Sequence, residues 1–341
     1  MTGILAAQIE SHQAKLAVFF ACIAGAGAAG YLLRRTGLAK AAWAKPIMSA
    51  AIIGVDAPIA LLAVWHLVIP PGVWKVPVTG ALAAVATSLI GLTVARRLRM
   101  DPKDRVVFGL QGGMGNVGYT LGGALCFALW GIQGLALEQM FCMMWPFFAF
   151  LFCFPIARHY GQPPTSKGPR PSVLRYAADV LTRSLTDLRS LPLYTVALGL
   201  VLNLKGFKPS PLIRQWHIID ALMVAGIVMQ FGSVGLTVRL RRLAPFWKPA
   251  LGTSALKFLV SPALMLGAAL AFGLSGVPLY VCLLLAVMPT ALYSVLMANL
   301  FDLNRDLANT TFILTHVICL GLVLAAIVVW GAGGLRALVG G

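Results

Sequence analysis

Ten long apolar segments run through this sequence, and they limit what the chain can fold into. A helix that crosses the hydrocarbon core of a bilayer needs about 20 mostly apolar residues. The segments lie approximately at residues 15–34, 46–69, 77–96, 105–130, 137–158, 190–205, 217–238, 249–273, 277–300 and 307–331. Because they are continuous apolar runs without the alternation of a half-buried strand, they predict helices. We therefore expect an all-α polytopic membrane protein with ten transmembrane helices.

Composition and charge agree with this expectation. The 341 residues are 59% hydrophobic and 11% charged, whereas a soluble domain is roughly 45–50% apolar and about 25% charged. The net charge of +17 would also suit a nucleic-acid partner. However, twenty of the 27 basic residues fall in alternate connections between the segments, which the positive-inside rule places in the cytoplasm. We therefore expect no nucleic acid, both termini outside, and the cytoplasmic (inner) membrane of a bacterium.

The sequence predicts neither a cleaved leader nor a metal centre. The first residues, MTGILAAQIESH, lack a basic region and a small-residue cleavage site, so no signal peptide is expected. The six cysteines lie within the apolar segments and form no C-x-x-C pair, so we expect no disulfide, metal or other cofactor. No nucleotide-binding or catalytic motif is present, which argues against an enzyme and against an ATP-driven pump.

Two similar stretches indicate an internal repeat. Residues 30–37 read GYLLRRTG and residues 199–206 read GLVLNLKG, an offset of 169 residues. Five segments per half is an odd number, so two similar halves would have opposite orientations, as in many secondary transporters. We expect one repeat at residues 1–158, a cytoplasmic linker with an amphipathic helix at 159–189, and a second repeat at 190–341.

The fourth and ninth segments each contain a helix-breaking stretch. The fourth reads GLQGGMGNVGYTLGG, and the ninth contains Pro289 within AVMPTALYS. Matched interruptions in two halves point to a transport site, although glycines can also serve only close helix packing. Helix halves that begin near Val117 and Thr290 would suit an anion, whereas the carbonyls before them would suit a cation. The candidate binding residues here are Gly115, Asn116, Val117, Gly118, Tyr119, Pro289, Thr290 and Tyr293.

Ionisable residues inside the segments are costly and therefore informative. Lys257 and Asp56 both fall near mid-depth, so they either pair with each other or Lys257 faces an anionic substrate. His316 is either a packing residue or a proton relay. Asp56 and His316 are the candidates for coupling to H⁺ or Na⁺.

Four further polar residues carry expectations about the fold. Glu138 and Gln139 open the fifth segment, so we expect them to be solvated at the outer surface. Gln230 and Ser233 lie inside the seventh segment, where hydrogen bonds to a neighbouring helix are expected.

The stretches GYLLRRTGL, GNVGYTLGGAL, LKFLVSPALML and AVMPTALYSVLMANLFDLNRDLANTTFILTHVI together resemble the auxin efflux carrier family, which is related in fold to the bile acid:sodium symporters. The resemblance implies two inverted five-helix repeats whose fourth and ninth helices cross at mid-membrane. It implies a scaffold of helices 1, 2, 6 and 7, against which the other helices move as an elevator. It also implies an organic anion such as auxin, malate or malonate as substrate, with Asn116, Pro289 and Thr290 at the site.

We therefore expect a secondary transporter for a small organic anion, with Lys257 and the helix termini holding its carboxylate. The alternatives are a sodium-coupled symporter of the bile-acid type for an amphipathic anion, a channel, or a membrane sensor. The other partner is the lipid bilayer, and a homodimer is possible.

Overall fold

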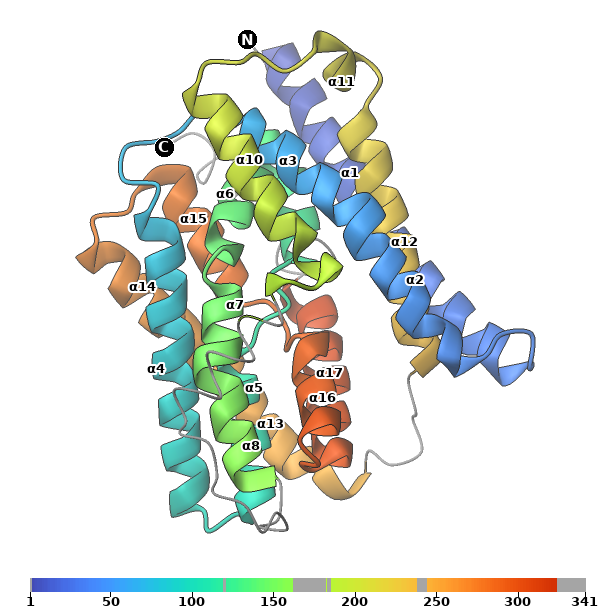
Figure 1. The fold of residues 1–341 in the computed structure, drawn as a ribbon, viewed down its shortest axis with the longest axis vertical. Helices are drawn as coiled ribbons and strands as arrows, with labels where there is room; N and C mark the ends of the chain where they lie inside the picture. The colour runs from blue at the N-terminus through green and yellow to red at the C-terminus, as the bar shows by residue number, and fades with distance from the viewer. Residues whose placement is uncertain (1, 119–120, 162–181, 183–184, 238–243, 324–341) are drawn as a thin grey trace.

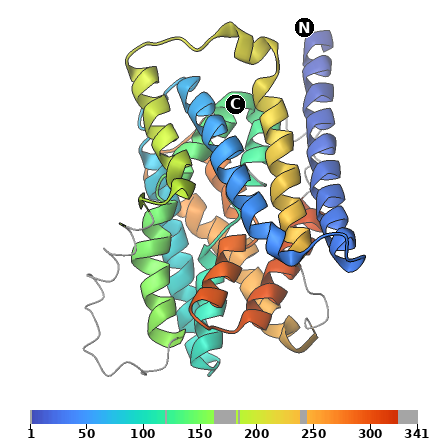
Figure 2. The same cartoon turned by 45° about the vertical axis from the view of Figure 1, so that its right-hand side comes forward.

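Long apolar helices dominate the computed structural model, which describes residues 2–118, 121–161, 182, 185–237 and 244–323 (Figures 1 and 2). Within these residues, six helical segments are long and apolar enough to cross a membrane: Ala17–Arg35, Ala41–Trp65, Lys75–Arg97, Gly122–Gly161, Ile218–Thr237 and Trp247–Ala271. The same residues contain one isolated β-bridge and no strand. The prediction of an all-α polytopic membrane protein is confirmed, whereas the count of ten spans and the inverted repeat remain predictions.

The predicted spans correspond to helices or to consecutive short helices. The first half contains α1 (Thr2–Arg35), α2 (Ala44–Ala51), α3 (Ala57–Trp65), α4 (Lys75–Arg97), α5 (Pro102–Gly113), α6 (Gly122–Cys142), α7 (Trp145–Phe147) and α8 (Phe154–Gly161). The second half contains α10 (Leu191–Leu204), α11 (Pro211–Gln215), α12 (Ile218–Thr237), α13 (Trp247–Ala255), α14 (Ser261–Ala271), α15 (Gly276–Ala286), α16 (Leu292–Leu300) and α17 (Arg305–Ile318). Most of the predicted linker helix at 159–189 and the end of the last span lie outside the described residues.

Prolines shape three of the spans. The π-helical segments Ile52–Asp56, Phe148–Cys153 and Leu256–Val260 each end two residues before a proline. A proline has no N–H to donate to the carbonyl four residues earlier, and its ring crowds that carbonyl. The helix widens locally as a result, and such bulges often occur at functional sites. Two of the three segments contain the buried charges Asp56 and Lys257.

The chain turns back on itself within α6, at Gly131. This residue has φ of 59°, a left-handed conformation that glycine adopts without steric cost. The two limbs of α6 then pack together, so that Gly123 and Glu138 are in contact although fifteen residues separate them. The turn therefore ends the fourth predicted span next to residue 130, where the sequence indicated, and the fifth begins about five residues earlier than the predicted residue 137.

Helix contacts divide the described residues into two groups. In the first group α1 packs along α12, α3 along α10, and α2 against α12. In the second group α4 packs on α5, α13 on α17, and α14 and α6 on α15. Figure 1 shows the first group across the top and along the right-hand side, with α4 at the left and α5, α8, α13, α16 and α17 in the lower part of the view. The groups meet mainly where α1 and α3 touch α6.

The glycines of the two similar stretches lie at helix crossings. A Cβ atom at Gly30 of α1 would overlap the carbonyl of Gly232 in α12, and one at Gly199 of α10 would stand 2.8 Å from the carbonyl of Leu61 in α3. Each glycine thus allows the first helix of one half to approach the second helix of the other half. This reciprocal pairing is what an inverted repeat predicts.

Candidate functional site

The two interrupted segments cross each other. Helix α5 ends at Gly113 and α6 begins at Gly122, while α15 ends at Ala286 and α16 begins at Leu292. An antiparallel bridge joins Gly115 to Thr290 between these ends. The backbone N–H of Asn116 donates to the carbonyl of Pro289 at 2.6 Å, and that of Ala291 donates to Met114 at 2.9 Å. The structure therefore brings together two stretches that the sequence separates by 173 residues.

The start of α6 is satisfied by the chain itself. The N–H of Gly122 donates to the carbonyl of Asn116 at 3.3 Å, and that of Gly123 donates to Gly118 at 2.9 Å. These amides therefore do not point at an incoming ligand. The predicted helix starts near Val117 and Thr290 were wrong by five and two residues, because α6 begins at Gly122 and α16 begins at Leu292.

Lys257 lies beside this crossing. Its side chain is 2% exposed, and a Cβ atom placed on Gly115 would stand only 2.8 Å from its Nζ atom. A methyl group at position 115 would therefore displace the ammonium group from its position against the backbone. Within the described residues Lys257 forms no ion pair, so the predicted pairing with Asp56 is absent.

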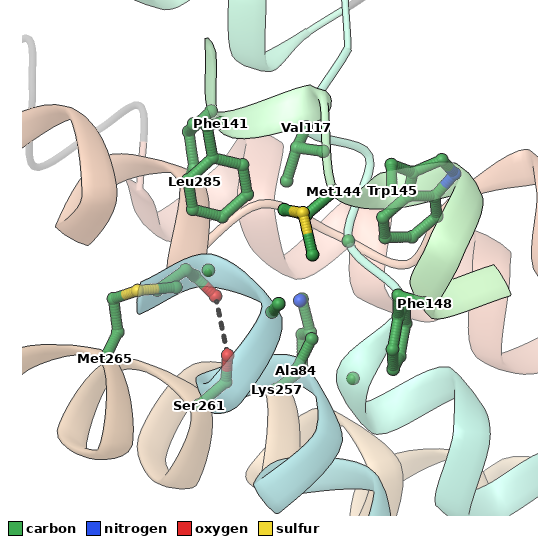
Figure 3. Close-up of a pocket in the computed structure, with 15 residues that line it drawn as sticks. Ala84, Val117, Phe141, Met144, Trp145, Phe148, Lys257, Ser261, Met265 and Leu285 are labelled. Atoms are coloured by element: carbon green, nitrogen blue, oxygen red, sulfur yellow. Dashed lines mark hydrogen bonds between the residues drawn. The ribbon is translucent and has the colours of Figure 1, made fainter. Parts of the chain in front are cut away.

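A small cavity of about 30 Å³ opens in front of the Lys257 ammonium group. Figure 3 shows the ammonium pointing into it, toward Met144 and Phe148. Its lining residues are Gly80, Ala81, Ala84, Gly113, Gly115, Val117, Phe141, Met144, Trp145, Phe148, Lys257, Ser261, Met265, Leu285 and Ala286. The hydroxyl of Ser261 donates to the carbonyl of Ala286 at 3.3 Å, close to the end of α15. The cavity thus combines one cation with walls that are mainly apolar and aromatic.

Threonine hydroxyl groups form hydrogen bonds with the second interrupted segment. The N–H of Thr290 donates to Oγ1 of Thr315 at 3.2 Å, and the two threonine hydroxyls are 3.0 Å apart. The Thr315 hydroxyl also lies 2.8 Å from the carbonyl of Thr311 on its own helix. Thr290 and Thr315 are both fully buried, so these bonds satisfy polar groups that water does not reach.

His316 bonds to the first interrupted segment. Its Nδ1 atom is 2.8 Å from the carbonyl of Phe312, which can only accept, so Nδ1 carries the proton. The neutral ring then accepts at Nε2 from the side-chain amide of Asn116, at 3.4 Å. The structure brings His316 and Asn116 together, while the proton-relay role of His316 remains a prediction.

Asp56 pairs with a neutral residue. Its carboxylate is 3% exposed and accepts from Nε2 of Gln230, at 2.9 Å to one oxygen and 3.1 Å to the other. This bond joins the second and seventh spans, as the sequence predicted for Gln230. The same expectation for Ser233 was wrong, because its hydroxyl donates to the carbonyl of Met229 in its own helix.

Glu138 and Gln139 are not solvated, contrary to expectation. Glu138 is 0% exposed and Gln139 is 2% exposed. The turn at Gly131 places both residues about two turns inside the second limb of α6, and the first limb contacts Glu138 at Gly123. A hydropathy plot could not show this, because Gly131 is one of many glycines in the region.

Some of the candidate binding residues lie away from the cavity. Tyr293 stacks on Phe154, with ring centroids 5.7 Å apart, and it does not line the cavity. Pro289 and Thr290 do not line the cavity either: the Pro289 carbonyl accepts from the N–H of Asn116, and the N–H of Thr290 donates to Thr315. Tyr119 lies outside the described residues. The sequence did not identify Phe141, Trp145 and Phe148 as residues that line the cavity. The one local irregularity among them is Pro146, which interrupts the apolar run.

Comparisons with known proteins support the resemblance found in the sequence. A family model described as membrane transport protein matches residues 182–327. Probable auxin efflux carrier component 1c of Oryza sativa subsp. japonica is 27% identical over 188 residues, which is 52% of this chain and 31% of that protein. Auxin efflux carrier component 1 of Arabidopsis thaliana is 32% identical over 115 residues, or 33% of this chain and 18% of that protein. The resemblance to the auxin efflux carrier family is confirmed.

The matched relatives differ in how much of their length is covered. An uncharacterized transporter of Methanocaldococcus jannaschii is 25% identical over 264 residues, which is 75% of this chain and 78% of that protein. The chain spans at most about a third of the length of the two plant auxin efflux carriers above. The matched range 182–327 contains Lys257, Thr290 and His316 but neither Gly115 nor Asn116.

Proposed function

We propose that this chain is a secondary transporter for a small organic anion, and that the ammonium group of Lys257 binds the carboxylate of that anion. The position of Lys257 carries this proposal, because it is buried at the crossing of two interrupted helices and forms no ion pair with any residue that the structure describes. A charge inside a membrane protein is costly unless an opposite charge or a polar partner compensates it. A bound carboxylate in the cavity would supply that compensation.

The lining of the cavity favours a monocarboxylate with an apolar or aromatic body. Among the described residues it offers one cation, whereas a dicarboxylate would call for a second compensating group. Phe141, Trp145 and Phe148 supply flat apolar surfaces against which a ring would pack. The plant relatives are named auxin efflux carriers, and indole-3-acetate, an aromatic monocarboxylate, is therefore the first compound to test.

The transport cycle that we propose is an elevator-like alternating access. A cavity of about 30 Å³ is large enough for a water molecule but not for an aromatic acid. The site must therefore widen during the cycle. The division of the helices into two groups supports this proposal, in which one group would slide against the other with α6 at the boundary. Ten spans in two inverted repeats, with both termini outside, are part of this proposal.

The proposal is tested with a pair of lysine variants in proteoliposomes. Lys257→Met removes the cation and keeps the length of the side chain, while Lys248→Met removes an exposed cation over Trp247 at the start of the same helical segment. Uptake of labelled carboxylates is measured with pH and sodium varied independently, beside protein-free liposomes. We expect Lys257→Met to lose saturable uptake and Lys248→Met to keep it. Normal saturable uptake by Lys257→Met would refute the site assignment.

A further inference from the structure

Glu138 is a buried acid that the proposed site does not use. It is 0% exposed and lies in the second limb of α6. One carboxylate oxygen accepts from the Cys142 thiol at 2.9 Å, and the other accepts from the side-chain amide of Gln139. Both donors are uncharged, and within the described residues Glu138 forms no ion pair. An ionised carboxylate in such a place is costly.

Among the side chains that the structure describes, the elements packed around α6 place no cation in an ion pair with Glu138. The helices in contact are α1, α3, α4 and α15. Their titratable or charged residues with described side chains are Cys22, Tyr31, Arg34 and Arg35 on α1, Asp56 just before α3, Lys75, Arg96 and Arg97 on α4, and Tyr280 and Cys282 on α15. The cations of this set lie at helix ends. Among the described residues, the charge of Asp56 acts on Glu138, and the charge of Glu138 acts on Cys126 and Cys142.

The carboxyl group of Glu138 touches the start of α6, where the interrupted segment ends. A Cβ atom on Gly123 would stand 2.9 Å from Oε2 of Glu138, and the N–H of Gly123 is bonded to Gly118. One turn further along α6, Phe141 lines the cavity in front of Lys257. Glu138 and Lys257 therefore lie at opposite ends of one interrupted segment. A change of charge on Glu138 is in a position to act on the segment that faces the substrate.

We propose that Glu138 binds the proton that this transporter moves together with its anionic substrate. The inference rests on the proposed function. With the site empty, the positive charge of Lys257 is balanced by ionised Glu138. When the substrate carboxylate binds at Lys257, Glu138 takes up one proton from water, and the loaded unit again has no net charge from these three groups. Moving a unit without net charge through the membrane avoids the cost of moving a charge.

The surroundings of Glu138 suit a proton rather than a sodium ion. The Gln139 amide and the Cys142 thiol both present hydrogens to the carboxylate. A metal cation requires several oxygen lone pairs directed at it instead. Within the described residues no cluster of three or more metal-binding side chains occurs. The ligand of this site is therefore a proton.

The test compares Glu138→Gln with the wild-type protein and with Asp220→Asn. Glutamine has the shape of glutamic acid but cannot ionise, and Asp220 is an acid near the start of α12, away from this site. Difference infrared spectra of the substrate-free protein are recorded over a pH titration. We expect the band of a titrating protonated carboxyl group in the wild type and in Asp220→Asn, and its loss in Glu138→Gln. An unchanged band in Glu138→Gln would overturn the assignment.

Transport supplies the second measurement. Labelled indole-3-acetate uptake into proteoliposomes is measured with the external pH lowered by one unit, after subtraction of uptake by protein-free liposomes. The wild-type rate should rise by up to about tenfold, because one proton is bound in each cycle. Glu138→Gln should keep exchange of labelled for unlabelled compound and lose this response, whereas an unchanged response would overturn the proposal. Should the wild type move no carboxylate at all, the proposed function fails, and the infrared band still decides whether Glu138 binds a proton.

Discussion

Asn116 and Pro289 are joined by a backbone hydrogen bond of 2.6 Å, although they belong to opposite halves of the sequence. A second bond of 2.9 Å returns from Ala291 to Met114, so the two interrupted segments satisfy one another as two strands would. Unsatisfied backbone groups are not tolerated at membrane depth, and this exchange removes four of them. The backbone of the crossing is thus held by its own hydrogen bonds, and Lys257 lies against it.

Gly115→Ala tests the close approach of Lys257 to the backbone of the crossing. The new methyl group would stand 2.8 Å from Nζ and would force the ammonium group away from the crossing. We expect binding of the transported carboxylate to weaken by about tenfold, or roughly 1.4 kcal/mol. The measurement is a titration followed by thermal unfolding in detergent, since a ligand stabilises the folded protein by mass action. Gly267→Ala in α14, where a Cβ atom would meet nothing within 4 Å, is the control and should bind normally.

Thr315→Val tests the hydrogen bond between Thr315 and the second interrupted segment. Valine keeps the shape of threonine but removes the oxygen that accepts from the buried N–H of Thr290. A buried donor left without a partner costs about 1–3 kcal/mol. Thr310→Val on the same helix removes a hydroxyl that donates to the backbone carbonyl of Asp306 one turn earlier, and it should cost less because it leaves no buried N–H without an acceptor. Equal losses of unfolding free energy in the two variants would contradict the predicted role of Thr315.

The sequence predicted the two helix breaks because their cause is local. Pro289 and the glycines around Asn116 disfavour a continuous helix wherever they occur, so the approximate positions of the breaks follow from the local sequence. The choice of Lys257 as a candidate binding residue also followed from the sequence, because a lysine inside an apolar run has few structural explanations. That the two breaks bond to each other, however, depends on helix packing over 173 residues of sequence.

The environment of Glu138 was not predictable for a related reason. Its burial follows from the turn at Gly131, and only the folded chain distinguishes that glycine from its neighbours. Ser233 illustrates a second limit. A serine in a helix can bond either to another helix or to a carbonyl one turn earlier, and the sequence does not decide between them.

Asp302 gives a prediction about pH. Its carboxylate lies in the loop that precedes α17 and accepts at 2.9 Å from Lys103 in the first turn of α5. This hydrogen bond and the charge of Lys103 hold the pKa of Asp302 below its usual value of 3.8. A lowered pKa in the folded state means that the stabilisation is present at neutral pH and is lost as the pH falls through that pKa. The difference in unfolding midpoint between wild type and Asp302→Asn should therefore be largest near neutral pH. It should vanish in acid and shrink in high salt, because the pair is exposed; a difference that grew on acidification would contradict this sign.

The bond between Asp56 and Gln230 gives the last prediction, a double-mutant cycle across the boundary of two spans. Gln230→Leu leaves the buried Asp56 carboxyl without its amide donor, which should cost at least about 1–3 kcal/mol of unfolding free energy. Asp56→Leu leaves the Gln230 amide unpaired in the same way. The double variant removes both polar groups, so its loss should be smaller than the sum of the single losses by about 0.5–3 kcal/mol. Unfolding in mixed detergent micelles gives the three values, and strict additivity would mean that the bond contributes nothing to the packing of α12 against the second span.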